Sequence, residues 1–444
     1  MSFMDPKPLT ATAAVADVGN PASPLGAALS ATILDQVEAP ISAAVTPVST
    51  TVDALGKRSS DAITSWWCTP RAEYNDMRQR VYFTGVSRSG LQHVGYFDLR
   101  EKTVHRFPTA SYEADDHNTP SILIEDDKPP IVTIPRHGQA ANVKIRIGTA
   151  PHALDTLGAE ITVPFAGLTS YAHIMRQTGT DNIAILTRDE GASSGLALNK
   201  SADYGATWGT SFRLFGSGYI TFRQVGNTIY GAAAAHPITA TNGALHGFYI
   251  NATTGDIFSH HSGTAVGNLW TNSTVISSAN LTIIRQNMDT DTPTNTTRLF
   301  DVGPAGSVAV MDFHKSTPEL GGTYKVLRKK AGGTWSAEVL TTSGVPLGYD
   351  ASSYVGGMAF GATDNEIYLC RESSGTWTLE RWTATANVWS YIETLETRTG
   401  GGKLGRPIMP RKGEGEGHLI VGDYHRYVPE NYYDYMADQT LVEG

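Results

Sequence analysis

The chain has 444 residues, of which 40% are hydrophobic and 17% charged, so it can bury a large core. Its formal net charge of −9, with no basic stripe, argues against nucleic acid as the main partner. No apolar run approaches the ~20 residues of a membrane-spanning helix. Two cysteines, Cys68 and Cys370, are too few for a disulfide framework or a zinc site, and we expect buried free thiols.

Residues 1–60 differ in composition from the rest and are expected to form a separate arm. They are rich in Ala, Ser, Thr, Val and Pro, and Ser23-Pro24 can begin a short helix in SPLGAALSATILDQV. The start, MSFMDPKPLT, lacks the basic and apolar regions of a secretory signal. Such a segment has little to bury by itself, so we expect it to pack on a partner or on copies of itself. A disordered linker is the alternative.

Residues 61–444 show short β-like runs separated by turn signals. RVYFTGV-SRSG-LQHVGYFDL and IAILTR-DEGASSG-LALNKS are strand–turn–strand patterns, and similar runs continue to HLIVGDYHRY near the end. No long amphipathic helix interrupts them. Many short strands at even spacing are typical of an all-β sandwich, barrel or propeller.

The segment SADYGATW, residues 201–208, favours the propeller. It has the form of an Asp-box turn, whose five positions are Ser201, Asp203, Gly205, Thr207 and Trp208. The carboxylate can accept backbone N–H groups, the glycine can adopt a positive φ, and the tryptophan can pack back on the blade. AGGTWSAE and SSGTWTLE are weaker copies without the aspartate. We therefore expect a β-propeller in which this box is structural.

Two histidines flank a predicted hairpin in DDHNTPSILIEDDKPPIVTIPRHG. The apolar runs 121–124 and 131–135 surround the turn EDDKPP, and His117 and His137 are almost symmetric about its centre. They are therefore expected nearly opposite each other at the open end of the hairpin. A lone histidine at a strand end is more often structural, so the joint placement is what indicates a site.

The next predicted hairpin places a second pair in the same way. YAHIMR and IAILTR flank the turn QTGTDN, and Tyr171 and Arg188 are symmetric about it. Successive blades of a propeller are related by rotation, so the open ends of equivalent hairpins lie on one face. Two histidines, a tyrosine and an arginine are thus expected to converge. Arginine matches a carboxylate, histidine transfers a proton near neutral pH, and a tyrosine of lowered pKa can do the same. This set suits β-elimination from a uronic acid.

Several segments of the chain together resemble the BNR-repeat propellers that include the ulvan lyases of polysaccharide lyase families 24 and 25. They include WWCTPRAEY, DDHNTPSILI, PRHG, SYAHIMRQTGTDNIAILTR, SADYGATW, LHGFYI and HLIVGDYHRYVPENYYDY, spread over residues 62–438. The resemblance implies a seven-bladed propeller in which His117, His137, Tyr171 and Arg188 carry out elimination on an acidic polysaccharide. Asn118, His246 and Tyr249 are implied as substrate contacts. It implies no cofactor, although a structural metal ion is left open because no ligand set can be assembled.

The arm resembles the starts of tail or fibre proteins of actinobacteriophages, in the stretch ADVGNPASPLGAALSATILDQV. This implies a trimeric depolymerase in a virion tail, or an extracellular protein, joined to other tail proteins through residues 1–60. The alternative from another class is a non-catalytic glycan-binding receptor protein. A sialidase-type hydrolase is a third possibility, which needs an arginine triad and a Glu–Tyr pair. GRPIMPR supplies arginines, but the remaining residues cannot be placed in the sequence.

Overall fold

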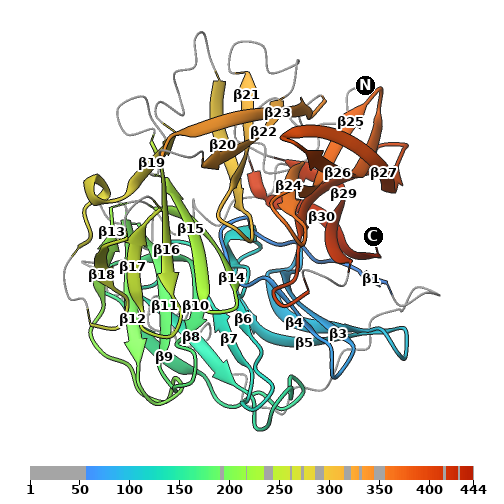
Figure 1. The fold of residues 1–444 in the computed structure, drawn as a ribbon. Helices are drawn as coiled ribbons and strands as arrows, with labels where there is room; N and C mark the ends of the chain where they lie inside the picture. The colour runs from blue at the N-terminus through green and yellow to red at the C-terminus, as the bar shows by residue number, and fades with distance from the viewer. Residues whose placement is uncertain are drawn as a thin grey trace, which may run out of the picture. The chain divides into compact units, whose positions relative to one another are not determined.

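The computed structural model describes residues 57–190, 195–216, 218–234, 244–260, 263–271, 275–285, 295–314, 322–329, 333–344, 356–413, 417–428 and 431–443. The expected arm lies outside these residues up to position 56. The described residues form seven antiparallel sheets, the blades of a β-propeller (Figure 1), which confirms the predicted fold. Across these ranges, no helix is long and apolar enough to cross a membrane.

The first three blades use consecutive strands, each paired with the next along the chain. The first blade comprises β2 (Ala72–Asn75), β3 (Arg80–Val86), β4 (Leu91–Asp98) and β5 (Thr103–Ser111). The second comprises β6 (Ile122–Leu123), β7 (Ile131–Ile134), β8 (Asn142–Ile147) and β9 (Ile161–Pro164), preceded by the short 3₁₀ helix η1 (Asp116–Asn118). The third comprises β10 (Thr169–Arg176), β11 (Ile183–Asp189), β12 (Gly195–Ser201) and β13 (Phe212–Phe215).

The next three blades continue this order, and the fourth has two additional strands. The fourth comprises β14 (Tyr219–Val225), β15 (Thr228–Ala234), β16 (Leu245–Asn251), β17 (Asp256–Ser259), β18 (Ala265–Asn268), the 3₁₀ helix η2 (Ser278–Asn280) and β19 (Thr282–Arg285), which pairs with β16. The fifth comprises β20 (Asn295–Val302), β21 (Val308–His314), β22 (Gly322–Lys329) and β23 (Trp335–Thr342). The sixth comprises β24 (Gly357–Phe360), β25 (Glu366–Ser373), β26 (Thr376–Thr385) and β27 (Val388–Arg398).

The seventh blade joins the two ends of the propeller. It orders β28 (Lys403–Ile408), β29 (His418–Val428) and β30 (Asn431–Glu443) before β1 (Arg58–Ser59), which pairs with β30. The blade thus includes two residues before the boundary expected at residue 61. The Asp438 carboxylate pairs with the Arg58 guanidinium and accepts the Asp61 backbone N–H at 2.7 Å. Hydrogen bonds and charge pairs therefore close the ring.

The segment SADYGATW forms a hydrogen-bonded turn between β12 and β13. Asp203 Oδ1 accepts the Ser201 hydroxyl and the Thr207 backbone N–H, both at 2.8 Å. Gly205 has φ +89°, and the Trp208 indole N–H donates to its carbonyl at 2.9 Å. The Trp208 ring packs against the apolar cluster between the second and third blades. The turn thus has the arrangement expected of these residue types.

Residues 66–72, the central segment, pack between the inner strands of the ring. The Trp67 ring stacks on Tyr219 with 4.6 Å between ring centroids, and lies 4.8 Å from Phe300. Trp66 fills the space beside Gly357, where a Cβ atom would lie 1.9 Å from the indole, so only glycine fits there. The segment is also bonded directly to the third blade, because the Thr69 carbonyl accepts the Ile174 backbone N–H at 3.0 Å.

One buried hydroxyl links the fifth and sixth blades. Tyr324 Oη donates to the Cys370 carbonyl at 2.6 Å and accepts the Gly357 N–H at 2.8 Å. Tyr324 is 1% exposed, so neither backbone group can turn to water if the hydroxyl is removed. Cys370 and Cys68 are both buried free thiols, as expected from the sequence.

We expect Tyr324→Phe to lower the free energy of unfolding by about 1–3 kcal/mol, because it leaves two buried backbone groups unpaired. The measurement is the denaturant midpoint followed by tryptophan fluorescence. Tyr96→Phe is the matched control, since the Tyr96 ring packs on His105 and its hydroxyl has no hydrogen-bond partner among the described residues. Equal midpoints for the two variants would contradict a linking role for Tyr324.

Candidate active site

The structure brings together the four side chains that the sequence singled out. His117 lies in η1, His137 follows β7, Tyr171 is in β10 and Arg188 is in β11. The two imidazole rings are stacked, with centroids 3.9 Å apart and planes 2° from parallel. The His117 ring also lies 5.0 Å from the Tyr171 ring, and the Arg188 guanidinium carbon lies 4.7 Å from the Tyr171 ring centroid. Elements of the second and third blades thus form one cluster.

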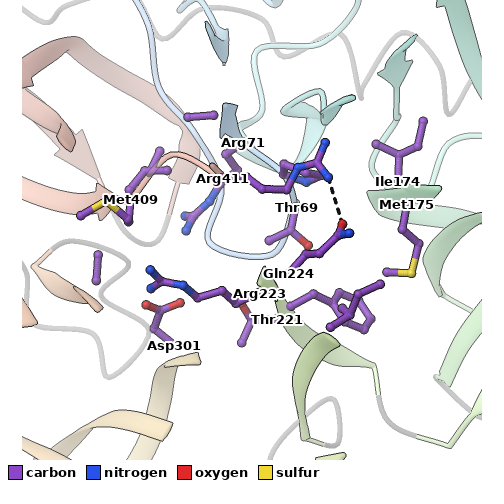
Figure 2. Close-up of a pocket in the computed structure, with 16 residues that line it drawn as sticks. Thr69, Arg71, Ile174, Met175, Thr221, Arg223, Gln224, Asp301, Met409 and Arg411 are labelled. Atoms are coloured by element: carbon purple, nitrogen blue, oxygen red, sulfur yellow. Dashed lines mark hydrogen bonds between the residues drawn. The ribbon is translucent and has the colours of Figure 1, made fainter. Parts of the chain in front are cut away.

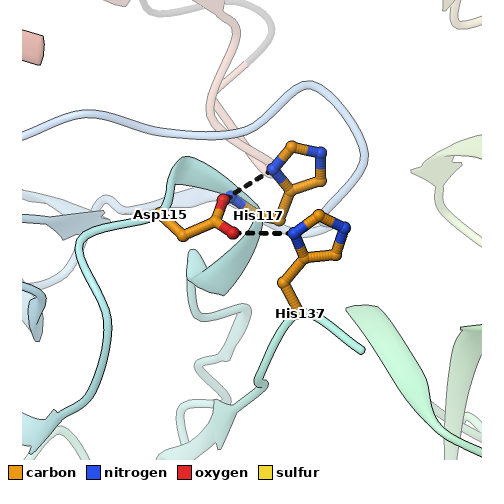
Figure 3. Close-up of side chains that lie close together, drawn as sticks. All are labelled: Asp115, His117 and His137. Atoms are coloured by element: carbon orange, nitrogen blue, oxygen red, sulfur yellow. Dashed lines mark hydrogen bonds and ion pairs between the residues drawn. The ribbon is translucent and has the colours of Figure 1, made fainter. Parts of the chain in front are cut away.

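A single carboxylate holds both histidines in place. Asp115 caps η1, and its Oδ1 accepts the His117 backbone N–H at 2.9 Å and the His117 Nδ1–H at 2.7 Å. Its Oδ2 accepts the His137 Nδ1–H at 2.7 Å (Figure 3). Because an ionised carboxylate only accepts, Nδ1 of each ring carries a proton. In Figure 3 both Nε2 atoms point away from Asp115 on the same side, so Nε2 is the atom through which each ring can act.

His117 is cationic at neutral pH. Burial alone would favour its neutral form, but Asp116, whose Oδ1 lies 2.9 Å from Nδ1, and then Asp115 raise the pKa of His117 to about 9. Burial also opposes ionisation of Asp115, yet the hydrogen bonds from His117 and His137 hold the pKa of Asp115 well below its usual value. Arg406, 1% exposed, pairs with Asp116 at 2.7 Å and lowers the pKa of that carboxyl. Asp115, Asp116, His117 and Arg406 thus form a balanced buried network.

Tyr171 occupies a β-bulge, which corrects one detail of the predicted hairpin. Ser170, rather than Tyr171, pairs with Arg188, and the register shifts before Ala172 pairs with Thr187. Tyr171 has φ +54°, a left-handed conformation that costs a side-chain-bearing residue about 1–2 kcal/mol. Bulges at strand ends redirect side chains. The bulge turns the Tyr171 ring toward His117 and beneath Arg188.

Arg188 is 3% exposed and permanently charged. Burial disfavours its charge, but Tyr171, Tyr219 and Glu190 raise its pKa above the ordinary value. Its Nε donates to Glu190 Oε1 at 2.8 Å, and its Nη2 approaches the same oxygen and lies 3.4 Å from His137 Nε2. Since guanidinium only donates, His137 Nε2 faces it with its lone pair. Nη1 is buried without an acceptor among the described residues, an unsatisfied donor of the kind that often marks a functional site.

Exposure differs within the cluster. Tyr171 is 1% exposed and His117 6%, whereas the His137 side chain is 18% exposed. Glu190, on the other side of Arg188, is similarly exposed at 20%. A ligand approaching this face therefore meets His137 and Glu190 before it meets Tyr171.

The three expected substrate contacts lie elsewhere or act indirectly. Asn118 is fully buried, and its Oδ1 accepts the His137 backbone N–H at 2.7 Å, so it positions that histidine. His246 is in β16 opposite Ala233, and burial lowers its pKa. Tyr249, further along β16, stacks on Phe258 with 4.8 Å between centroids. Among the described residues, neither His246 nor Tyr249 contacts the four-residue cluster.

Several residues of the site were missed in the sequence. Asp115 and Asp116 stand directly beside His117 in DDHN, and an aspartate before a short helical turn is a recognisable cap. Glu190 lies two positions after Arg188, on the same strand side, which is also a detectable signal. Arg406 comes from β28 in the seventh blade, and nothing in the sequence relates it to residue 116.

Asp115, His117 and His137 also have ligand atoms that lie within 4.8 Å of one another, a spacing suited to a metal ion. Both Asp115 oxygens, however, already accept imidazole Nδ1–H groups. A metal would have to displace those protons. The donor set therefore fits a hydrogen-bonded dyad better than a metal centre.

These features define a seven-bladed all-β propeller with a stacked histidine pair, one ring buried and one partly exposed. No protein-family model matches the sequence, and no curated protein matches it. Among solved structures, the fold is similar to an ulvan lyase of polysaccharide lyase family PL25 bound to -[GlcA(1-4)Rha3S]-, with a TM-score of 0.63, 11% identity and coverage of 90% of this chain and 96% of that one. Polysaccharide lyase Uly1 gives a TM-score of 0.54 at 9% identity, covering 87% and 98%. At such identities the likeness shows the fold alone.

We expect Asp115→Asn to lower the pKa of His117 by about 1 unit or more, because an amide cannot supply the negative charge that favours the imidazolium. The measurement is a histidine titration by NMR between pH 5 and pH 10. Asp155→Asn, at an exposed position away from the cluster, is the control and should leave the His117 titration near pH 9. An unchanged His117 titration in Asp115→Asn would show that the carboxylate does not set its charge.

Proposed function

We propose that the protein is a polysaccharide lyase that cleaves a uronate-containing glycan by β-elimination. The observation that carries the proposal is the stacked histidine pair, fixed by Asp115 and lying against Tyr171 and Arg188. The pair presents one protonated and one unprotonated Nε2 on the same side. That combination supplies an acid and a base within one cluster. The propeller fold shared with PL25 ulvan lyase and Uly1 supports the same class of reaction.

Two positively charged side chains suit recognition of the uronate carboxylate. His117 is charged below about pH 9, and Arg188 is charged at every working pH. Placing positive charge near the carboxylate stabilises the negative charge that develops when the neighbouring C5–H bond breaks. The Glu190 carboxylate occupies one edge of the Arg188 guanidinium, so a uronate would share Arg188 with it or replace it.

The protonation states of the two imidazole rings decide which ring takes a proton and which can give one. His137 Nε2 takes the C5 proton, the C4–O bond breaks, and a C4=C5 double bond forms. The leaving oxygen then receives a proton from His117 Nε2–H or from the Tyr171 hydroxyl. If the two histidines act as base and acid, both proton transfers occur on one side of the sugar, because their Nε2 atoms point the same way (Figure 3).

The test is the ultraviolet absorbance of the unsaturated product, with purified protein and a panel of acidic polysaccharides. We expect His137→Ala to lower the rate by about 10²–10⁴-fold, the usual effect of losing a general base. A comparable loss in Tyr171→Phe would identify the phenol as the acid, whereas a small loss would assign that role to His117. His105→Ala, a half-buried histidine in β5, is the control. A flat trace on a glycan that the protein binds would contradict the lyase proposal.

A non-catalytic glycan-binding module is the second candidate. It is favoured by the burial of Tyr171 and by the existing pairing of Arg188 with Glu190, which leaves little of either group open to a ligand. In that case the same face binds an acidic sugar without converting it to a product. Binding without absorbance change separates this candidate from the lyase.

We further propose that residues 1–60 attach the propeller to a virion tail as a trimer. The support is the apolar, aromatic-poor composition of the arm and its resemblance to tail and fibre proteins. We expect the full chain to have the mass of a trimer in light scattering and a variant lacking residues 1–56 to be monomeric. A monomeric full chain, or a truncated chain that stays trimeric, would contradict this role of the arm.

A further inference from the structure

Glu190 is bonded to one edge of the Arg188 guanidinium. Its Oε1 accepts the Arg188 Nε–H at 2.8 Å and also pairs with Nη2 of the same group. Glu190 directly follows β11, the strand that carries Arg188, and its backbone N–H donates to the Leu168 carbonyl at 2.9 Å. The main chain therefore fixes Glu190 beside Arg188, and only the side chain of Glu190 needs to turn for the pair to open.

The rest of the Arg188 side chain is enclosed. It is 3% exposed, and its Nη1 atom is buried without an acceptor among the described residues. The Tyr171 ring centroid lies 4.7 Å from the guanidinium carbon, so this ring covers one face of the group. His137 and Glu190, whose side chains are 18% and 20% exposed, are more open to solvent than Tyr171. An anion that arrives from solvent therefore meets Arg188 along the edge of Nε and Nη2, which Glu190 already occupies.

Glu190 carries the same chemical group as the proposed substrate. Burial opposes ionisation of its carboxyl, but the charge of Arg188 holds the pKa of Glu190 below its ordinary value, so the group is ionised at neutral pH. Its Oε1 also lies 4.0 Å from His137 Nε2. A uronate carboxylate placed on Arg188 beside His137 would be repelled by Glu190 at close range in a poorly solvated site. Replacement of Glu190 by the uronate is therefore favoured over sharing of Arg188 by the two carboxylates.

We propose that Glu190 is a specificity-determining residue, which occupies Arg188 in the free protein and yields that edge to a uronate carboxylate but not to a neutral sugar. The inference rests on the uronate substrate of the proposed function. A carboxylate restores the charge-assisted hydrogen bonds that Arg188 loses when Glu190 leaves, whereas a hydroxyl or an ester does not. Because Glu190 competes for the same edge, the apparent affinity for uronate is reduced in proportion to the fraction of molecules in which that edge is free.

The test is the affinity of the full chain for glucuronate and for its uncharged methyl ester, measured by ligand-observed NMR. We expect Glu190→Gln, which keeps the shape of the side chain and removes its charge, to bind glucuronate about tenfold more tightly than the unaltered protein. The methyl ester should show no gain. Glu113→Gln is the matched control, because Glu113 is 28% exposed and pairs at 3.7 Å with Arg136, the neighbour of His137. It removes one negative charge nearby without altering the pair at Arg188, and should leave the affinity for glucuronate unchanged.

A crystal structure with glucuronate gives a second readout on the unaltered protein. The sugar carboxylate should accept the Nε–H and Nη2–H of Arg188, with the Glu190 side chain turned away. The inference is overturned if Glu190→Gln binds glucuronate no more tightly, if the methyl ester or Glu113→Gln shows an equal gain, if neither the unaltered protein nor Glu190→Gln binds glucuronate, or if bound glucuronate leaves the pair of Arg188 and Glu190 intact. Tighter binding with a flat absorbance trace would reject the lyase reaction and keep this inference, and unchanged binding with rising absorbance would do the opposite.

Discussion

The carboxylate of Asp115 is the group on which the candidate site depends. It accepts the Nδ1–H of both histidines and, as the cap of η1, also fixes the turn that carries one of them. Without this acceptor, two imidazoles 3.9 Å apart would have no common orientation. The negative charges of Asp115 and Asp116 are balanced by the positive charges of His117 and Arg406, and Arg406 belongs to β28. Because β28 is in the last blade, the charges of the site are complete only after the ring has closed.

The central segment supports the candidate active site from inside the ring. At one face the Trp67 ring supports Tyr219, which lies 5.6 Å beneath the Arg188 guanidinium. Four residues later, Arg71 lines a cavity of about 80 Å³ between the inner strands (Figure 2). A short stretch of chain therefore contributes both to the surroundings of Arg188 and to this cavity, and its position is fixed by backbone contacts with the surrounding blades, such as that between Thr69 and Ile174.

The sequence predicted the parts of the fold that depend on local pattern. Ile122 pairs with Val132 and Leu123 with Ile131, which agrees with the turn centre used to place His117 and His137. Such a register follows from apolar runs and turn residues. The bulge at Tyr171 was not predictable, because tyrosine carries no signal for a left-handed backbone. Arg406 could not be assigned to the site because it lies far from Asp116 in the sequence, and only the closed ring brings the two together. The number of blades came from the family resemblance rather than from the strand pattern.

The left-handed backbone of Tyr171 is a local strain that the packing of its ring outweighs. Glycine adopts φ +54° without steric cost, but it would leave a cavity where a ring that is only 1% exposed now packs in the apolar core. Glycine would also remove the ring that lies between His117 and Arg188. A tyrosine kept in this conformation is therefore what a chain retains when the aromatic ring matters more than the strain it causes. A sequence library screened for thermostability alone would therefore also retain an aromatic residue at this position.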